Sequence, residues 1–209
     1  MTQRDDVYMS GALSDLTEEE YENLTTQVYD RVAKICFDVG LTCYRPHKST
    51  TTPSKGMPHG KIWKVDYERV SGAGLVVAYI GKPSLGVGSE IEMARTAGVP
   101  VVLLCEGDKQ ERLSRLILGN PAVKDMIVFE HPDEIDDPLR KALYKEFSLR
   151  NLDAVAEDES WPHTDYKKLV KVLTAEVEGQ KYRNKSIKPL TKDDWKGIWR
   201  DLKAKPNGK

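Results

Sequence analysis

Residues 75–105 read LVVAYIGKPSLGVGSEIEMARTAGVPVVLLC, and this stretch decides the fold. It opens with a continuous apolar run, 75–80, and closes with another, 99–105. Continuous apolar strands, rather than alternating ones, are typical of a sheet that is covered on both faces. The intervening residues 88–97 have a helical pattern. The stretch therefore predicts a β-α-β unit of a parallel sheet.

The same alternation of elements continues on both sides of this stretch. We expect three further strands, at residues 7–9, 41–44 and 126–129. We expect four further helices, one that begins at a capping box of Thr17 and Glu20, and others at residues 62–70, 112–118 and 139–152. The predicted fold is a doubly wound α/β domain around a mostly parallel five-stranded sheet, with Rossmann-like or flavodoxin-like layering.

The composition changes along the chain and divides it in two. We place the α/β domain at residues 1–155 and a basic helical extension at 156–209, with the boundary in an acidic, proline-containing stretch. Residues 160–209 hold 13 Lys and Arg against 6 Asp and Glu, a net charge of +7. An apolar stripe at helical spacing consists of Trp195, Ile198, Trp199 and Leu202. We expect this stripe to dock on protein; spread-out lysines disfavour nucleic-acid binding.

The overall composition excludes two broad classes of protein. Hydrophobic residues make up 39% and charged residues 31% of the chain, and no apolar run approaches the roughly 20 residues that span a bilayer. The polar first residues lack a basic-then-apolar export signal. The three cysteines have no spacing suited to a metal. We therefore expect a cytoplasmic protein with reduced thiols that binds no membrane and needs neither a metal nor another cofactor.

The loop 81–90 has the features of a ligand site. In open α/β sheets ligands bind outside the carboxyl ends of the strands, and this loop leaves such an end. Gly86 and Gly88 let backbone N–H groups approach a ligand, and Ser84 adds a hydroxyl. We expect Glu90 on the first turn of the next helix, where the helix dipole keeps a carboxylate ionised. Taken alone, the pattern favours a simpler interpretation, a glycine turn in which Glu90 only complements the dipole.

The string 81–91, GKPSLGVGSEI, with the apolar run that follows it, resembles the 2′-deoxynucleoside 5′-phosphate N-hydrolases of the nucleoside 2-deoxyribosyltransferase superfamily. The resemblance covers residues 5–150 and leaves the basic extension out. It implies that residues 1–155 are a catalytic domain. It also implies that Glu90 attacks the anomeric carbon of the sugar.

The resemblance further implies roles for residues outside the loop. Asp66, 24 residues before Glu90, would bind the sugar or protonate the departing base. Tyr8, in the string VYMSG, would hold the nucleophile in place. Ser84 would bind the phosphate of the substrate, and Ser114, 24 residues after Glu90, would do so from a neighbouring subunit. We therefore expect a homodimer or a higher homo-oligomer.

Two segments depart from the family pattern. After the first strand the family has a glycine-rich turn with an arginine that helps to hold phosphate, whereas residues 11–15 read GALSD. Gly11 remains a predicted substrate contact, but the arginine is missing and Asp15 would repel a phosphate. Residues 46–60 form a longer loop than expected, which we interpret as a lid with His47 as a substrate contact. The alternative is a solvated loop without such contacts.

The resemblance implies an enzyme that hydrolyses the N-glycosidic bond of a nucleoside or deoxynucleoside 5′-monophosphate. A carboxylate suits the oxocarbenium-like sugar of this reaction, because it stabilises the cation and then traps it as a covalent intermediate. Free base and sugar phosphate would be the products. The first alternative is a nucleoside 2-deoxyribosyltransferase, in which a second base captures the intermediate. The second alternative is a non-catalytic nucleotide sensor.

Overall fold

The computed structural model describes residues 6–49 and 57–158, and its centre is one sheet of five strands. The strands are β1 (Val7–Ser10), β2 (Cys43–Tyr44), β3 (Leu75–Tyr79), β4 (Val101–Glu106) and β5 (Val123–Phe129). Their order across the sheet is β2-β1-β3-β4-β5, and each neighbouring pair is parallel. This is the flavodoxin-like order, so the predicted α/β fold is confirmed.

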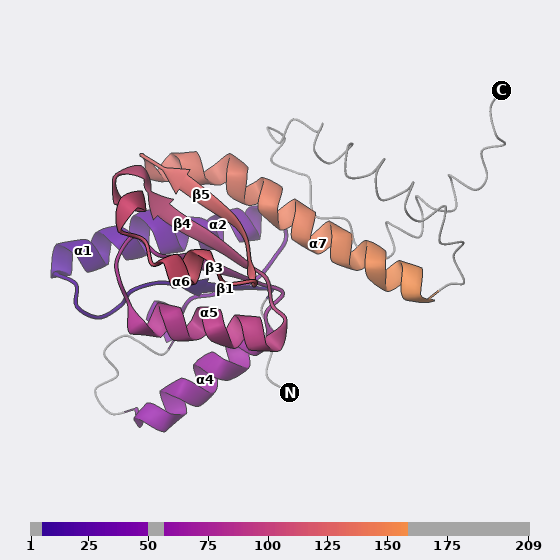
Figure 1. Cartoon of the computed structure of the whole chain (residues 1–209), viewed down its shortest axis with the longest axis horizontal. Helices are drawn as coiled ribbons and strands as arrows, with labels where there is room; N and C mark the ends of the chain where they lie inside the picture. Colours follow the sequence, from indigo (N-terminus) through magenta and orange to yellow (C-terminus); the bar gives the residue numbers. More distant parts are fainter. Residues whose placement is uncertain (1–5, 50–56, 159–209) are drawn as a thin grey trace. The chain divides into compact units, whose positions relative to one another are not determined.

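Helices lie on both faces of the sheet, with α4 and α5 on one face and α2 on the other (Figure 1). The α-helices are α1 (Glu18–Asn23), α2 (Asp30–Asp38), α3 (Pro46–Ser49), α4 (His59–Gly72), α5 (Leu85–Ala97), α6 (Arg115–Leu118) and α7 (Asp136–Asp158). A π-helical segment covers Leu24–Tyr29, and 3₁₀ segments cover Gly107–Arg112 and Pro132–Ile135. The predicted capping box is present, since Thr17 Oγ1 accepts from the Glu20 N–H and Glu20 Oε2 accepts from the Thr17 N–H.

One hydrophobic cluster joins α5 to the strands beneath it. Alternate residues of a strand point to the same face, so one side chain in two along β1, β3 and β4 faces α5. The buried members of the cluster include Tyr8, Val76, Ala78 and Leu103 from the strands and Val87, Ile91 and Ala94 from α5. Full burial of a large aliphatic side chain stabilises by about 1.5–3 kcal/mol. Packing therefore holds α5 firmly against the sheet.

The helix α5 begins earlier than the sequence predicts, at Leu85 rather than at residue 88. Ser84 is its N-cap residue: the backbone of Ser84 is extended, and its Oγ accepts from the Val87 N–H at 3.4 Å. The helix ends at Gly98, whose φ of 70° is the left-handed conformation common at helix ends. Both glycines expected in a loop therefore lie in the first turns of α5.

Two other elements differ from the predictions. Residues 46–60 were expected as one long loop, but Pro46–Ser49 forms α3 and His59 already opens α4. Proline is well suited to the first turn of a helix, which accounts for the start of α3. The expected helix at 112–118 is a 3₁₀ segment, Gly107–Arg112, followed by the short α6.

The chain divides into two compact units, residues 1–139 and 140–209. The helix α7 spans this division, and the expected boundary at residue 155 falls near its end. That boundary stays a prediction, and the predicted helices of the extension lie outside the described residues. Within residues 6–49 and 57–158, no helix is both long and apolar enough to cross a membrane.

Candidate active site

Two hydroxyl groups hold the carboxylate of Glu90. Tyr8 Oη donates to Glu90 Oε1 at 2.7 Å, and Ser10 Oγ donates a short hydrogen bond to Glu90 Oε2. Tyr8 and Ser10 point to the same face because they are two residues apart on β1. The sequence placed Tyr8 beside Glu90 through the resemblance but gave no role to Ser10. The alternation of the strand was the signal that could have found it.

The pKa of Glu90 differs from the sequence-based expectation. Burial of the carboxyl raises its pKa from 4.5 to about 7, the hydrogen bonds from Ser10 and Tyr8 lower it, and the nearby charge of Asp66 raises it. We expected Glu90 to lie on the first turn, where the helix dipole would keep it ionised near neutrality. That expectation is wrong because α5 begins at Leu85, so Glu90 lies on the second turn, where desolvation dominates.

Asp66, on α4, completes this cluster. Burial raises the pKa of its carboxyl, and the nearby Tyr8 hydroxyl partly offsets the rise. The same surroundings act on Tyr8, whose pKa is raised well above its usual range by burial and then by the charges of Glu90 and Asp66. Oδ1 of Asp66 is buried and has no hydrogen-bond partner among the described residues. A buried, unpaired carboxyl oxygen with a raised pKa suits a group that exchanges a proton with a ligand.

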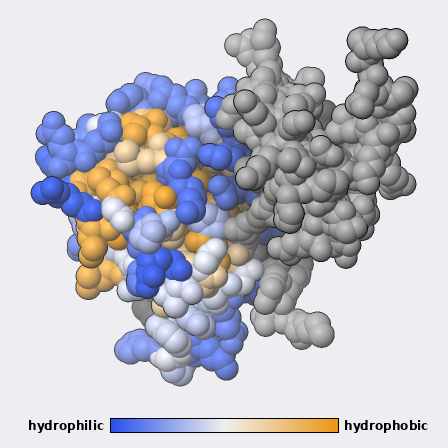
Figure 2. Space-filling model, turned by 45° about the vertical axis from the view of Figure 1, so that its right-hand side comes forward, coloured by the Kyte–Doolittle hydropathy of each residue, from blue (hydrophilic) through white to orange (hydrophobic). Residues whose placement is uncertain are grey.

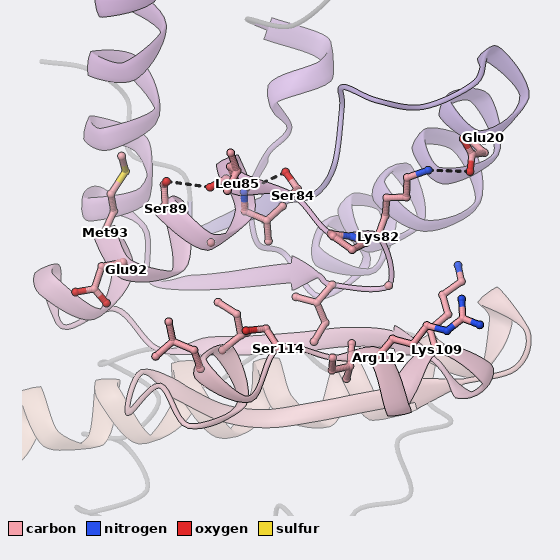
Figure 3. Close-up of a pocket in the computed structure, with 18 of the residues that line it drawn as sticks. Glu20, Lys82, Ser84, Leu85, Ser89, Glu92, Met93, Lys109, Arg112 and Ser114 are labelled. Atoms are coloured by element: carbon pink, nitrogen blue, oxygen red, sulfur yellow. Dashed lines mark hydrogen bonds and ion pairs between the residues drawn. The ribbon is translucent and has the colours of Figure 1, made fainter.

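A groove of about 1270 Å³ runs along the outer side of α5 (Figure 3). Ser84 and Ser114 lie on opposite walls, and Gly88 opens onto the groove from α5. The cationic side chains in its lining are Lys82, Lys109 and Arg112. Its acidic lining residues are Glu20, Glu92 and Asp108. Tyr8, Asp66 and Glu90 do not line this groove. The predicted site residues therefore form two sets, one around Glu90 and one in the groove, and α5 contributes to both.

The glycines of the first turns leave open space beside the backbone. A Cβ at Gly88 would meet nothing within 4 Å, and one at Gly86 would meet only Ser84 Oγ, at 3.6 Å. Gly11 is different, because a Cβ there would lie 2.4 Å from the ring of Tyr29. Tyr29 in turn donates to the carbonyl oxygen of Ala12 at 3.0 Å. Gly11 is therefore required for packing in the turn after β1.

His47 has contacts unlike those of a lid residue. It lies in α3, is 6% exposed, and its Nε2 is 3.1 Å from Oδ1 of Asp30. Burial lowers the pKa of His47, and the Asp30 carboxylate partly offsets this. Arg45 and Lys48 also pair with Asp30, at 2.8 and 3.1 Å. The helix α3 thus replaces the first part of the expected lid, and residues 50–56 lie outside the described part of the chain.

No group of three or more His, Cys, Asp or Glu side chains able to hold a metal ion occurs among residues 6–49 and 57–158.

A second polar cluster lies at the carboxyl ends of β3 and β4 and consists of Tyr79, Glu106 and Lys109. Tyr79 Oη donates to Glu106 Oε1 at 2.8 Å. Lys109 Nζ donates to Glu106 Oε1 at 2.7 Å and to Tyr79 Oη at 3.1 Å. Tyr79 neighbours Ala78 along β3, so its side chain leaves the opposite face of the sheet. The Tyr79 ring lies 6.0 Å from the ring of Tyr29.

This chain is similar in sequence to one curated protein and in structure to several solved ones. A 62-residue match, 32% identical, was found with 2′-deoxynucleoside 5′-phosphate N-hydrolase 1 of Syntrophotalea carbinolica; it covers 30% of this chain and 44% of that protein. The solution structure of BlsM aligns with 71% of this chain and 94% of its own, at 19% identity and a TM-score of 0.55. The structure of the CMP N-glycosidase BcmB from Clostridium botulinum covers 64% of this chain and 96% of its own, at 19% identity and a TM-score of 0.47.

The structural likeness to BlsM concerns the fold alone. No protein-family model matches the chain. The sequence match spans less than half the length of the curated relative. That relative nevertheless carries the name that the loop 81–91 led us to expect. The resemblance of this chain to the 2′-deoxynucleoside 5′-phosphate N-hydrolases is thereby confirmed.

Proposed function

We propose that this protein cleaves the N-glycosidic bond of a nucleoside or deoxynucleoside 5′-monophosphate and releases the free base and the sugar phosphate. The observation that carries the proposal is the carboxylate of Glu90, desolvated and held at both oxygens by Tyr8 and Ser10. A buried carboxylate aimed by fixed hydrogen bonds suits attack on a sugar carbon that develops positive charge.

The first step uses Glu90 and Asp66 together. The ionised carboxylate of Glu90 forms a bond to C1′ as the bond between C1′ and the base nitrogen breaks, and the electron pair of that bond leaves with the base. Protonated Asp66 gives its proton to the departing base. Burial raises the pKa of Asp66, which is the direction that a proton donor requires. The charge of Asp66 also raises the pKa of Glu90, so the two carboxyl groups retain a proton between them, and attack requires that this proton lies on Asp66.

The second step restores the enzyme. A water molecule attacks C1′, the ester bond to Glu90 breaks, and the carboxylate is regenerated. Asp66, now ionised, takes the proton that the water loses. Tyr8 and Ser10 act as positioning residues in both steps, because they fix the plane of the carboxyl group and stabilise its charge each time it is released.

The groove supplies groups for the phosphate of the substrate. Ser84 offers its hydroxyl and the backbone N–H groups of the first turn of α5 lie beside it, as in other anion sites at helix N-termini. The turn after β1 has no arginine, but Lys82, Lys109 and Arg112 line the groove instead. Lys82 pairs with Glu20 at 3.1 Å and Lys109 with Glu106 at 2.7 Å.

Of the three cationic side chains that line the groove, Arg112 is the one available to bind a ligand. It is exposed, it lines the groove, and it makes no ion pair with any residue in the described ranges. A guanidinium binds a phosphate through two parallel hydrogen bonds, which suits it to the role of the missing arginine. We therefore assign the phosphate to Ser84 and Arg112.

We also propose that the protein forms a homodimer or higher homo-oligomer in which Ser114 reaches the phosphate of a neighbouring subunit. Ser114 is exposed, and its side chain makes no capping hydrogen bond to the short α6. The groove exposes large apolar side chains: Leu85 is 94%, Leu116 83% and Trp63 57% exposed. Figure 2 shows apolar residues gathered on one face of the molecule. Apolar surface of this kind supports a protein contact.

The test is a chromatographic screen of the common ribonucleoside and deoxynucleoside monophosphates for release of free base. The unaltered protein should release base from at least one of them, and Glu90→Gln should reduce the rate by about 10³-fold or more, as expected for loss of a nucleophile. Equal base release by the two proteins would contradict the mechanism.

The same screen separates the alternatives. If a second base is supplied and the exchanged nucleoside or nucleotide accumulates, the protein is a transferase. If nucleotides bind tightly but none is turned over, the protein is a non-catalytic nucleotide sensor. The hydrogen bonds from Tyr8 and Ser10 to both oxygens of Glu90 support catalysis, because they orient a carboxyl group that would not attract an anionic ligand.

A further inference from the structure

A second tyrosine, Tyr44, lies next to the cluster of Tyr8, Ser10, Asp66 and Glu90, and its hydroxyl has no hydrogen-bond partner among the described residues. Tyr44 ends β2 and is paired with Tyr8 of β1 in the sheet. Their rings stack, with centroids 5.6 Å apart and planes at 24°. The guanidinium of Arg69 lies 4.7 Å from the centre of the Tyr44 ring. The ring is therefore fixed by its two neighbours.

The hydroxyl of Tyr44 has no hydrogen-bond partner within the described part of the chain, although the residue is only 7% exposed. Leaving a buried polar group unpaired costs about 1–3 kcal/mol. A phenylalanine would keep the stacked ring and avoid this cost. The hydroxyl therefore has no structural use that the described residues explain, and its cost is accounted for if a ligand pairs with it.

The unpaired Tyr44 hydroxyl is one of two such atoms around Tyr8. Oδ1 of Asp66 is the other: Tyr44 stacks on the ring of Tyr8, and the charge of Asp66 acts on the Tyr8 hydroxyl. Together they can give one hydrogen bond, from Tyr44, and accept one, at Asp66. A hydroxyl group matches this pair, since it accepts and donates at a single oxygen.

We propose that Tyr44 is a substrate-binding residue that, with Asp66, holds a hydroxyl of the sugar. This inference rests on the proposed function, which places C1′ at Glu90. Tyr8 touches Glu90 and stacks on Tyr44, so a group that reaches Tyr44 must lie close to C1′. The 2′-hydroxyl, on the adjacent carbon, is the first candidate, and the 3′-hydroxyl is the second.

Tyr44→Phe tests the proposal in two ways. Its thermal midpoint should equal or exceed that of the unaltered protein, because no protein hydrogen bond is lost. Its kcat/KM should fall by about tenfold, the value of one hydrogen bond, for a nucleotide that carries the bound hydroxyl. With 2′-deoxy and 3′-deoxy analogues of the same nucleotide, the fall should disappear for the analogue that lacks this hydroxyl.

Tyr79→Phe is the matched control for stability. Its hydroxyl has two partners, Glu106 and Lys109, so this change should lower the midpoint and leave the preference among the three sugars unaltered. A fall in kcat/KM for Tyr44→Phe that is the same for all three sugars, or no fall at all, overturns the inference. A lowered midpoint for Tyr44→Phe also overturns it. Absence of turnover by the unaltered protein overturns the proposed function and this inference together.

Discussion

The hydroxyl of Tyr8 donates a 2.7 Å hydrogen bond to Oε1 of Glu90, although 82 residues separate the two along the chain. They meet because β1 pairs with β3 and α5 follows β3 back across the sheet. Ser10 binds the other oxygen from the same strand. The topology of the sheet thus brings Tyr8, Ser10 and Glu90 together. Removal of either hydroxyl should change the pKa of Glu90.

Activity should depend on pH through Glu90. The attacking form is the carboxylate, so kcat/KM should rise as the pH passes through about 7, the pKa of Glu90. The bond from Tyr8 lowers that pKa, so Tyr8→Phe should move the midpoint of the rise to higher pH. Ser10→Ala should move it in the same direction. A pH profile of kcat/KM checks this, and a midpoint that stays in place or moves to lower pH contradicts the assignment.

Stability should show the opposite dependence on pH. In the unfolded chain Glu90 loses its proton near pH 4.5, whereas in the folded protein it does so near 7. The unfolded state therefore ionises first as the pH rises, and the free energy of unfolding falls between these values. Glu90→Gln carries no charge and should be more stable above pH 7, by up to about 3 kcal/mol. Urea unfolding at pH 4.5 and pH 8 measures this, and an equal difference at both pH values would rule it out.

Arg112→Ala should weaken the binding of the phosphate. We expect KM to rise by about tenfold for a nucleoside monophosphate and to stay the same for the nucleoside, with a smaller effect at high salt. Arg115→Ala is the matched control, since Arg115 is an exposed arginine three residues further along the chain, in α6, and does not line the groove. Steady-state kinetics on both substrates decide the point. Equal effects of the two variants would show that only net charge matters.

Two glycines near the loop should respond in opposite ways to alanine. A Cβ at Gly81 would lie 2.2 Å from Glu106 Oε2 and 2.6 Å from Tyr79 Oη, so Gly81→Ala should destabilise the protein by about 1–3 kcal/mol. Gly88 lies inside α5 with open space beside it, so Gly88→Ala should stabilise by about 0.5–1 kcal/mol. If the substrate approaches the backbone at Gly88, that variant should also raise KM. Denaturation and kinetics on the two proteins provide the check.

Exchange between subunits should reveal whether Ser114 acts in a neighbouring site. Glu90→Gln and Ser114→Ala each impair every site of their own homodimer. In a mixed dimer, one site combines the intact Glu90 of one subunit with the intact Ser114 of the other. Unfolding and refolding the two variants together should therefore give more activity than the sum of the two refolded separately. Simple additivity would mean that Ser114 does not act across an interface.

The strands were predictable because they depend on local pattern, whereas the contact between Tyr8 and Glu90 was implied by the resemblance of the loop to a known family. Continuous apolar runs marked β3 and β4, and the resemblance implied that Asp66 acts beside Glu90, whose pKa its charge raises in the structure. The start of α5 was missed because glycine is a poor helix former, and the two glycines of the loop suggested a turn. Capping by Ser84 and burial of Val87 outweigh that low propensity.

Properties that depend on burial could not be predicted from residue types. The pKa of Glu90 is set by how far its carboxyl is removed from water, which a sequence does not contain. His47 looked like a loop histidine until the structure paired it with Asp30 in α3. Tyr44 carries no motif, and its importance follows from which atoms surround it.

One helix presents its separate sides to separate tasks. Val87, Ile91 and Ala94 anchor α5 in the core, Glu90 points to the hydroxyls of β1, and Ser89, Glu92 and Met93 face the groove. Changes on the groove side leave the anchor and the nucleophile in place. The scaffold is thus open to redesign: exchanging a few outward-facing side chains should alter its choice of partner or substrate and leave the chemistry that we propose for Glu90 unchanged.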